Sequence, residues 1–508
     1  MSLPSADAAR TPAGRATLMR EGTEQDNLFT RIGVRPLVNG RGTFTIISGS
    51  CSLPQVKQAM YDASFYFVHL DELMEAVGQE LGQLTGAEWG IATTGCEAAI
   101  ALAVVACIAG TDPEKSQALP YVMGRDQVII PKHSRNPYDF GVRMTGVEVV
   151  EVDSAEELRS RVTARTAMIY ILSSPAAETG PLSIPNICAI AREKGVPVFV
   201  DAAAEEPLVP NVHLQHGATL VGYSGGKCLR GPQSSGLLIG QKDLCHAAYF
   251  QYAPNHNYGR AFKCSKEETM GLLAAVRQWY KRDHAAEQRA WLSWLQHIES
   301  RVQGLPSLST EYLQPIDLSN RSPRLRLNWD AQTLKITGTE LAARLDAGNP
   351  RIIVHDSSGV RPSQMASSLI IMPYMMEAAE ERIIADAIYE GLTKPGQYED
   401  AAVPSGSPVP VQGTWAVAIQ YARGAGEQQF TLQQSGNELT GTQQGELYSA
   451  ALKGAIHGGQ IELRSTMAVP GNFIEWTFQG NAQANTMTGT VDLGEYGKAA
   501  WEAIRNHD

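Results

Sequence analysis

One lysine, Lys227, occupies the position in this chain that is best suited to covalent chemistry. It lies in the run Ser-Gly-Gly-Lys-Cys-Leu-Arg-Gly-Pro-Gln that starts at Ser224, with apolar segments on both sides. Glycine neighbours allow the backbone to approach a ligand closely. An amine that is desolvated in a pocket loses its proton more readily and becomes a nucleophile. The alternative interpretation of this local pattern is a surface hairpin with one exposed lysine.

Two other segments offer groups that would complement such a lysine. Asp201 ends the apolar run Val-Pro-Val-Phe-Val-Asp, and Thr94, Gly95 and Cys96 follow a short strand and open a long alanine-rich helix. The free amides and the positive dipole end of a helix bind anions, so this helix start is a candidate phosphate site. An ordinary N-cap by Thr94 is the alternative.

A carboxylate that ends a buried strand and a glycine-flanked lysine on the next strand-like segment are what pyridoxal phosphate (PLP) requires. Lys227 would form the Schiff base, and Asp201 would keep the pyridinium nitrogen protonated so that the ring accepts electrons. The helix start, helped by Ser224, would donate hydrogen bonds to the cofactor phosphate. His133 would stack on the ring, although a histidine in a loop is also compatible with a structural or solvated role.

The pattern around these residues predicts a parallel α/β sheet. Apolar strands alternate with helices between residues 112 and 217, which is typical of strands covered on both faces. Ligands bind such sheets beyond the carboxyl ends of the strands, where Asp201, His133 and Thr94 are expected. Helical spacing is found over 53–84, 262–282, 287–302 and 376–392. The last of these helices and the three strands before it predict a smaller α+β unit.

The C-terminal region has a different period. After a linker rich in proline, serine and alanine, eight short alternating segments predict an up-and-down meander or a closed barrel. The predicted strands are 413–422, 427–434, 437–443, 449–457, 460–467, 473–480, 485–492 and 497–504. Trp415, Trp476 and Trp501 should form the core. This region offers no catalytic constellation, so we expect it to have a structural or assembly role.

The domain boundaries that we predict follow from these patterns. They are a mobile leader (1–30), a PLP-binding large domain with its N-terminal segment (31–285), a small α+β domain (286–395), a linker (396–410) and a β-barrel-like domain (411–508). Asn39 and Arg41 lie in a turn-rich segment at the start of the ordered chain. This segment either lines a pocket, with both side chains available to substrate, or is an ordinary loop.

Composition narrows the function classes. With 508 residues and 43% apolar content, the chain is long enough for two to four domains. The net charge of −11 disfavours broad nucleic-acid or anionic-membrane binding. Seven cysteines without CxxC spacing favour reduced thiols over a disulfide framework or a metal site. No apolar run is long enough to cross a membrane, and residues 1–24 have no signal-peptide core. We therefore expect a cytoplasmic enzyme.

Three segments resemble one branch of the fold-type-I PLP-dependent enzymes. They are Asp-Ala-Ala-Ala-Glu-Glu-Pro from Asp201, Ser-Gly-Gly-Lys-Cys-Leu-Arg-Gly-Pro-Gln from Ser224, and Lys-Glu-Glu-Thr-Met-Gly-Leu-Leu-Ala-Ala from Lys266. That branch holds bacterial selenocysteine synthase and the D-glucosaminate-6-phosphate ammonia-lyase-like proteins, and the second group matches better. The resemblance covers residues 30–395. It implies that Lys227 is the Schiff-base lysine and Asp201 the pyridine partner.

The resemblance also implies roles for a basic pair and a class of reaction. Arg260 and Lys263 match residues that handle an anionic group, although without the family they would be read as solvated charges. The implied function is a lyase that converts a hydroxylated or sugar-derived amino acid into a 2-keto acid and ammonia, in a homodimer or larger homo-oligomer. The alternatives are a PLP-dependent aldolase or racemase, a selenocysteine-synthase-like transferase, and a PLP-dependent sensor or sugar-binding protein. No nucleic-acid or membrane partner and no metal is expected.

Overall fold

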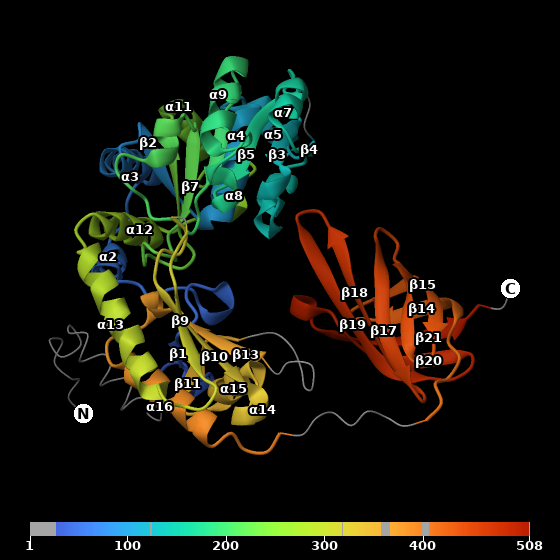
Figure 1. Cartoon of the computed structure of the whole chain (residues 1–508). Helices are drawn as coiled ribbons and strands as arrows, with labels where there is room; N and C mark the ends of the chain where they lie inside the picture. Colours follow the sequence, from blue (N-terminus) through green and yellow to red (C-terminus); the bar gives the residue numbers. More distant parts are fainter. Residues whose placement is uncertain (1–26, 122–123, 317, 357–365, 399–405, 507–508) are drawn as a thin grey trace. The chain divides into compact units, whose positions relative to one another are not determined.

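The structure is a computed structural model that describes residues 27–121, 124–316, 318–356, 366–398 and 406–506 (Figure 1). Most of the expected leader and part of the expected linker lie outside these residues. The chain divides into two compact units. The first holds the large and small α/β domains, and the second holds the C-terminal barrel. Among the described helices, none is long and apolar enough to cross a membrane.

A seven-stranded mixed sheet forms the centre of the large domain. Its strand order is β2-β8-β7-β6-β5-β3-β4, and β8 runs antiparallel to both of its neighbours. Strands such as β5 are buried along nearly their whole length, which explains their continuous apolar sequences. The strands are β2 (Trp89–Thr93), β3 (Gln127–Pro131), β4 (Glu148–Val152), β5 (Thr166–Leu172), β6 (Val198–Asp201), β7 (Leu220–Ser224) and β8 (Gly236–Gly240).

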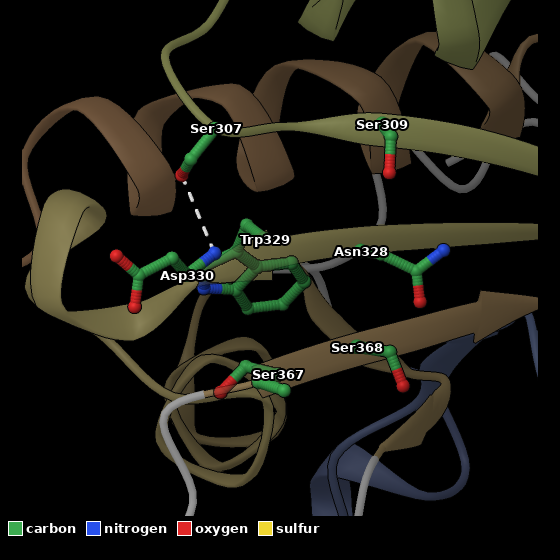
Figure 2. A pocket seen from close by; sticks show the side chains of 8 residues that line it. Ser307, Ser309, Asn328, Trp329, Asp330, Ser367 and Ser368 are labelled. Atoms are coloured by element: carbon green, nitrogen blue, oxygen red, sulfur yellow. Dashed lines mark hydrogen bonds between the residues drawn. The ribbon is translucent and has the colours of Figure 1, made fainter.

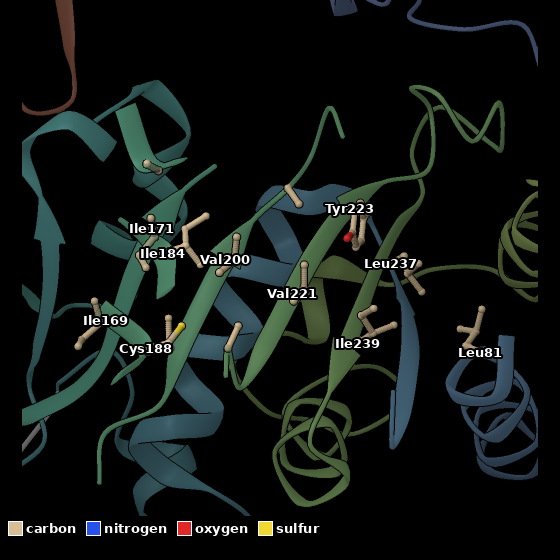
Figure 3. Close-up of a cluster of buried hydrophobic side chains, with 14 of the residues drawn as sticks. Leu81, Ile169, Ile171, Ile184, Cys188, Val200, Val221, Tyr223, Leu237 and Ile239 are labelled. Atoms are coloured by element: carbon tan, nitrogen blue, oxygen red, sulfur yellow. The ribbon is translucent and has the colours of Figure 1, made fainter. Parts of the chain in front are cut away.

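Helices cover both faces of this sheet. Figure 3 shows Ile169, Val200, Val221 and Ile239 on neighbouring strands, within a cluster that also contains Cys188 of α9. On the other face, the alanine-rich helix α4 is buried along nearly its whole length. The helices of this domain are α2 (Pro54–Ala63), α3 (Leu70–Thr85), α4 (Gly95–Ala109), α5 (Pro113–Ala118), α6 (Phe140–Arg143), α7 (Ala155–Arg161), α8 (Pro175–Glu178), α9 (Ile184–Lys194), α10 (Val212–His216), α11 (Lys242–Phe250) and α12 (Lys266–Trp279).

The small domain packs helices against one four-stranded sheet with the order β12-β13-β10-β9. A separate pair of parallel strands joins β1 to β11, so Val38 belongs to the small-domain core although it precedes the large domain in sequence. The elements are β1 (Leu37–Asn39), α13 (His284–Val302), β9 (Ser309–Leu313), β10 (Arg324–Asp330), α14 (Ala331–Leu334), α15 (Gly338–Ala347), β11 (Arg351–Ile353), β12 (His355–Asp356), β13 (Ala366–Ile371) and α16 (Glu380–Thr393).

The second unit is a closed barrel of eight antiparallel strands, which confirms the expected C-terminal architecture. Each strand pairs with its neighbour in sequence, and β21 closes the barrel on β14. Trp415, Trp476 and Trp501 are all buried inside, as predicted. The strands are β14 (Gly413–Gln420), β15 (Ala425–Ser435), β16 (Glu438–Gln444), β17 (Ser449–His457), β18 (Gln460–Val469), β19 (Asn472–Ala482), β20 (Thr486–Asp492) and β21 (Lys498–Arg505).

The fold-type-I architecture is also confirmed, with local corrections. The helix expected over 262–282 begins only at Lys266, because Ser265 and Glu268 form a capping box there. The chain before it forms a single 3-10 turn, Arg260–Phe262. The segment around Asn39, expected to be a turn or loop, contributes the short strand β1 before its turn. Strand β11 pairs with β1 and is not part of the four-stranded sheet.

The barrel core provides a direct test of this packing. Phe478 is fully buried and contacts the rings of Phe430, Trp476 and Trp501, whereas Phe473 on the same strand is 62% exposed. Phe478→Ala should lower the free energy of unfolding of the barrel by about 3–5 kcal/mol. The control, Phe473→Ala, should leave it nearly unchanged. Chemical unfolding followed by tryptophan fluorescence would measure both. Equal effects of the two substitutions would contradict the packing described.

Candidate active site

The residues singled out in the sequence gather at one edge of the large sheet. In the strand register, Gly236 of β8 pairs with both Thr93 and Ser224, so the ends of β2 and β7 lie level with each other. Asp201, at the end of β6, pairs with Gly222 of β7. The carboxyl ends of β2, β3, β5, β6 and β7 therefore share this edge, where ligands bind in open α/β sheets.

The loop that carries Lys227 is shaped by glycines. The Gly225 amide donates to the Ser235 carbonyl at 2.8 Å, and the Gly231 amide donates to the Gly225 carbonyl at 2.7 Å. A Cβ atom on Gly225 would lie 2.1 Å from Ser235 Oγ, and one on Gly226 would lie 2.4 Å from Gln233 Oε1. Side chains at these two positions would therefore force the loop to move. The glycines are needed for close packing beside a half-buried Lys227.

Asp201 is a buried carboxylate, with only 2% of its surface exposed. Its Oδ2 accepts a hydrogen bond from Tyr170 Oη at 2.8 Å. Its Oδ1 accepts from the Ala203 amide at 3.1 Å and from Cys96 Sγ at 3.5 Å. The Cys96 contact joins the start of α4 to Asp201, so the helix start and the carboxylate belong to one site.

Electrostatics indicate that Asp201 is suited to a cationic partner. Burial raises the pKa of Asp201, and this effect exceeds the opposing effects of the Tyr170 hydrogen bond and the Lys227 charge. A protonated ring nitrogen placed against the carboxylate would lower that pKa again and would recover the cost of burial. The residues present therefore fit the pyridine end of PLP.

The other end of the site fits a phosphate group. The Thr94 hydroxyl donates to the Phe262 carbonyl and contacts the Tyr252 hydroxyl at 3.3 Å, so it does not cap helix α4. The ordinary N-cap considered for Thr94 is therefore wrong. Gly95 has φ +82°, and no atom lies within 4 Å of the position that a Cβ would take. The first amides of α4 thus stand beside open space, as an anion site requires.

Ser224 and His133 lie at the same edge without touching Asp201. Ser224 ends β7, where its amide donates to the Ala203 carbonyl at 3.2 Å. His133 follows β3, and its Nε2 lies 3.2 Å from the Leu182 carbonyl oxygen. Since that carbonyl can only accept, Nε2 carries the proton and Nδ1 accepts from Ser134 Oγ at 3.2 Å. These two bonds fix the plane of the His133 ring.

Arg260 and Lys263 flank the phosphate end of the site. Both belong to the segment whose Phe262 carbonyl accepts from Thr94, and Arg260 is half-buried whereas Lys263 is exposed. Within the described part of the chain, neither side chain takes part in a hydrogen bond or ion pair. Two uncompensated cations beside the start of α4 make this corner attractive to anions.

Asn39 and Arg41 lie in a turn that follows strand β1 and packs with the small domain. The side-chain Oδ1 of Asn39 accepts hydrogen bonds from the backbone amides of Arg41 and Gly42 at 3.0 and 2.9 Å, so this side chain holds the turn. The Arg41 guanidinium stacks on Phe44 at 4.5 Å, and its buried Nε has no partner among the described residues. Tyr374 hydrogen-bonds Thr43 at 2.6 Å, and it lines one small cavity together with Cys228. Tyr374 thus links the Arg41 turn to the Lys227 loop.

The sequence analysis missed the groups that hold this loop from behind. Arg282 Nη1 donates to the Cys228 carbonyl at 3.0 Å and forms two hydrogen bonds with Glu287 at 2.8 and 2.9 Å. Arg230 donates to Glu377 of the small domain at 2.8 Å. Charged residues near helix ends are usually solvated, so the local pattern does not predict these contacts. Tyr170 was missed because it lies within an uninterrupted apolar strand.

The remaining surface features of the first unit are less suited to this chemistry. A groove of the small domain is lined by Ser307, Ser309, Asn328, Asp330 and Ser368, and Figure 2 shows Ser309, Asn328 and Ser368 on three strands, with Ser307 on the loop before β9. It lies at the opposite end of β10 from Arg324. Within the described ranges, no group of three or more His, Cys, Asp or Glu could hold a metal ion.

Comparisons with known proteins agree with this geometry. Residues 52–264 match the family described as Cys/Met metabolism PLP-dependent enzyme. A 5'-C-glycyluridine monooxygenase-decarboxylase from Streptomyces sp is 33% identical over 65% of this chain and 84% of its own length. The D-glucosaminate-6-phosphate ammonia lyase of Salmonella typhimurium is 29% identical over 63% of this chain and 87% of its own length. A solved structure of D-glucosaminate-6-phosphate ammonia-lyase superposes with a TM-score of 0.64 at 26% identity, covering 73% of this chain and 99% of that one.

The fold, the site and these relatives define the class of protein. This chain belongs to the fold-type-I family of PLP-dependent enzymes. The resemblance derived from the lysine motif and the expected PLP cofactor are both confirmed. The interpretation as a sensor or sugar-binding protein without enzymatic activity is not supported. The monooxygenase-decarboxylase relative is a kind of enzyme that the sequence motifs did not indicate.

The network behind Lys227 predicts a pH dependence. His284 Nε2 lies 2.8 Å from the Trp279 carbonyl oxygen and Nδ1 lies 3.3 Å from Glu287, so both ring nitrogens face acceptors. The hydrogen bond to Glu287 raises the pKa of His284, with burial opposing it. Burial disfavours the Glu287 charge, but the bonds from His284 and Arg282 outweigh it and lower the pKa of Glu287 to about 2.

Protonated His284 should therefore contribute fully to the free energy of unfolding below the pKa that it has in the unfolded chain, about 6.5. This contribution should be lost as the pH rises through the higher pKa of His284 in the folded protein. The Glu287 contribution should persist above its ordinary pKa and disappear only as the pH falls toward about 2. Urea unfolding of the wild type and of His284→Gln across this range would measure the effect. The stability difference between the two proteins should shrink at alkaline pH. A constant difference would contradict the protonated state of His284.

Proposed function

We propose that this chain is a PLP-dependent ammonia lyase that acts on a hydroxylated or sugar-derived amino acid. The observation that carries the proposal is the pairing of a half-buried, glycine-flanked Lys227 with the buried Asp201 carboxylate at one edge of the sheet. The 29% identical relative and the superposed structure, both named as ammonia lyases, support the reaction class. When bound, PLP supplies an electron sink for charge that develops at the substrate Cα.

The residues of the chain would divide the work as follows. Asp201 holds the proton on the ring nitrogen, and Tyr170 and the Ala203 amide hold Asp201 in place. The first amides of α4, with Ser224, would bind the cofactor phosphate, and His133 would stack on the ring. Lys227 Nζ would hold the cofactor in the resting enzyme and, once the substrate amine has displaced it, the freed amine would take the proton from the substrate Cα.

The overall reaction balances without another reactant. Loss of the Cα proton and of the β-hydroxyl releases one water molecule and leaves an unsaturated amine. Addition of one water molecule to that product gives a 2-keto acid and ammonia. A hydroxyl group at the β-carbon is therefore required of the substrate, which sugar-derived amino acids provide.

Two cationic groups would recognise the anionic parts of the substrate. We place the carboxylate at Arg41, which Asn39 orients through the turn. A second anionic group, as phosphate or carboxylate, would bind to Arg260 and Lys263 beside the start of α4.

A homodimer stays a prediction, which sedimentation velocity would test. A single-chain mass would contradict it.

A second candidate function is an oxygen-dependent decarboxylation of an amino acid. It is favoured by the 33% identity to an enzyme named as a monooxygenase-decarboxylase. The two functions differ in their products. The lyase releases ammonia without consuming dioxygen, whereas the alternative consumes dioxygen and releases carbon dioxide. Measuring dioxygen, carbon dioxide and ammonia with one substrate panel would separate the two functions.

Removing the lysine should abolish turnover. The panel would contain D-glucosaminate, its 6-phosphate, and both enantiomers of serine and threonine, with ammonia detected enzymatically. Lys227→Ala should lower kcat by at least about 10³-fold, since it removes both the attachment point and the base. The control is Lys242→Ala, because Lys242 lies on the surface near Glu75 at 3.7 Å. Retained turnover in Lys227→Ala would overturn the assignment.

Removing a substrate-binding cation should affect binding more than turnover. Arg41→Ala should raise KM about 10-fold or more, with a much smaller change in cofactor affinity. The matched control is Arg326→Ala, because Arg326 is already paired with Glu311 at 3.0 Å. Steady-state kinetics and cofactor titration would measure both quantities. A KM that does not change in Arg41→Ala would return this residue to a structural role.

A further inference from the structure

A buried ionisable pair lies behind the active site and takes no direct part in the proposed reaction. Glu205 and His213 are 1% and 2% exposed, and Glu205 Oε2 lies 2.6 Å from His213 Nε2. The other carboxylate oxygen, Oε1, accepts a hydrogen bond from the buried Ser173 hydroxyl. Moving ionisable groups out of water costs free energy, which well-directed hydrogen bonds partly recover. These two bonds therefore fix the Glu205 side chain in one place.

Glu205 ends a short segment, residues 201–205, which we call the strap. Ser173 holds both ends of the strap, because its amide donates to the Asp201 carbonyl at 2.9 Å and its hydroxyl donates to Glu205. Within the strap, the Glu205 amide donates to the Ala202 carbonyl at 2.9 Å, and the Ala203 amide donates to Asp201 Oδ1 at 3.1 Å. The orientation of the Asp201 carboxylate thus depends on the conformation of the strap.

The strap also holds the loop that carries Lys227. The Glu205 carbonyl accepts a hydrogen bond from Cys228 Sγ at 3.0 Å, and Cys228 directly follows Lys227. The Ala203 carbonyl accepts from the Ser224 amide at 3.2 Å, three residues before Lys227. The strap is therefore bonded to the loop on both sides of the lysine.

Helix α10 anchors the end of the strap. Asn211 caps this helix, and its Nδ2 donates to the Tyr223 hydroxyl of β7 at 2.7 Å. Tyr223 is buried, and β7 leads into the Lys227 loop. His213 thus lies on a helix that is fixed to this strand, and its contact with Glu205 sets the position of the strap end.

We propose that Glu205 is a positioning residue that fixes the Asp201 carboxylate relative to Lys227 Nζ. Ser173 and His213 hold the Glu205 carboxylate, and the strap transmits that position to both members of the pair. The inference rests on the pairing of Lys227 with Asp201 in the proposed function. Catalysis requires that reacting groups be held at the right separation, so a small movement of the strap should lower turnover strongly.

The first test compares kinetics of full-length holoenzyme variants with the best substrate of the panel. Glu205→Ala removes both side-chain bonds and should lower kcat at least about 30-fold, with KM within about 3-fold. Glu205→Gln should keep kcat within about 3-fold of the wild type, because its amide can accept from Ser173 and donate to His213. His213 can change tautomer for this, since its Nδ1 has no partner among the described residues. The matched control, Glu206→Ala, should resemble the wild type, because Glu206 is less buried and pairs with Arg321 at 3.3 Å.

Two readouts need no substrate, so they separate a failure of this inference from a failure of the proposed reaction. The first is the pH dependence of the visible absorption of the cofactor in the holoenzyme. The Lys227 charge acts on Asp201, so a change in their separation alters protonation around Lys227. The midpoint should move by at least about 0.5 pH in Glu205→Ala and stay at the wild-type value in Glu205→Gln.

The second readout is alkylation of the holoenzyme with iodoacetamide, followed by peptide mass spectrometry. Cys228 should react at least about 10-fold faster in Glu205→Ala, because the strap no longer holds its thiol. Cys188, which is 1% exposed in α9, should keep its wild-type rate. Equal acceleration at both cysteines would indicate general loosening and would overturn the proposal. So would an unchanged Cys228 rate or cofactor midpoint in Glu205→Ala, or equal losses of kcat in Glu205→Ala and Glu205→Gln.

Discussion

The active site depends on the fact that one carboxylate, Asp201 at the end of β6, is buried. A charge with 2% of its surface exposed is unfavourable unless the protein compensates it. Tyr170, the Ala203 amide and Cys96 supply hydrogen bonds, yet burial still raises the pKa of Asp201. A further cation held against Asp201 would offset this cost. Asp201 would hold a protonated pyridine nitrogen of PLP in this way, and the cofactor would then supply the electron sink that the chemistry needs.

The position of Lys227 follows from contacts on several sides of its loop. Glycines at 225 and 226 let the loop pack against Ser235 and Gln233. Arg282 holds the next carbonyl from behind, and Arg230 reaches Glu377 of the small domain. The small domain thus takes part in shaping the site through the Arg230–Glu377 pair and through Tyr374. Both domains of the first unit therefore contribute contacts to the loop that carries Lys227.

Much of this was accessible from sequence, and what was missed has physical reasons. The Lys227 loop stood out because glycines and a cation interrupt apolar strands, and the barrel strands stood out because buried and exposed residues alternate, as in β14 and β21. Tyr170 gave no signal because an aromatic residue in a buried strand is indistinguishable from core. The Arg282–Glu287–His284 network depends on how α12 and α13 meet, which local patterns do not encode.

The most direct test of the central claim is to locate the covalent attachment of the cofactor. The holoenzyme would be reduced with borohydride, digested, and mapped by mass spectrometry. The account predicts that the phosphopyridoxyl group is found on the peptide that contains Lys227 and on no other. A label on a different lysine, or a protein that binds PLP without any reducible attachment, would contradict the assignment of this site.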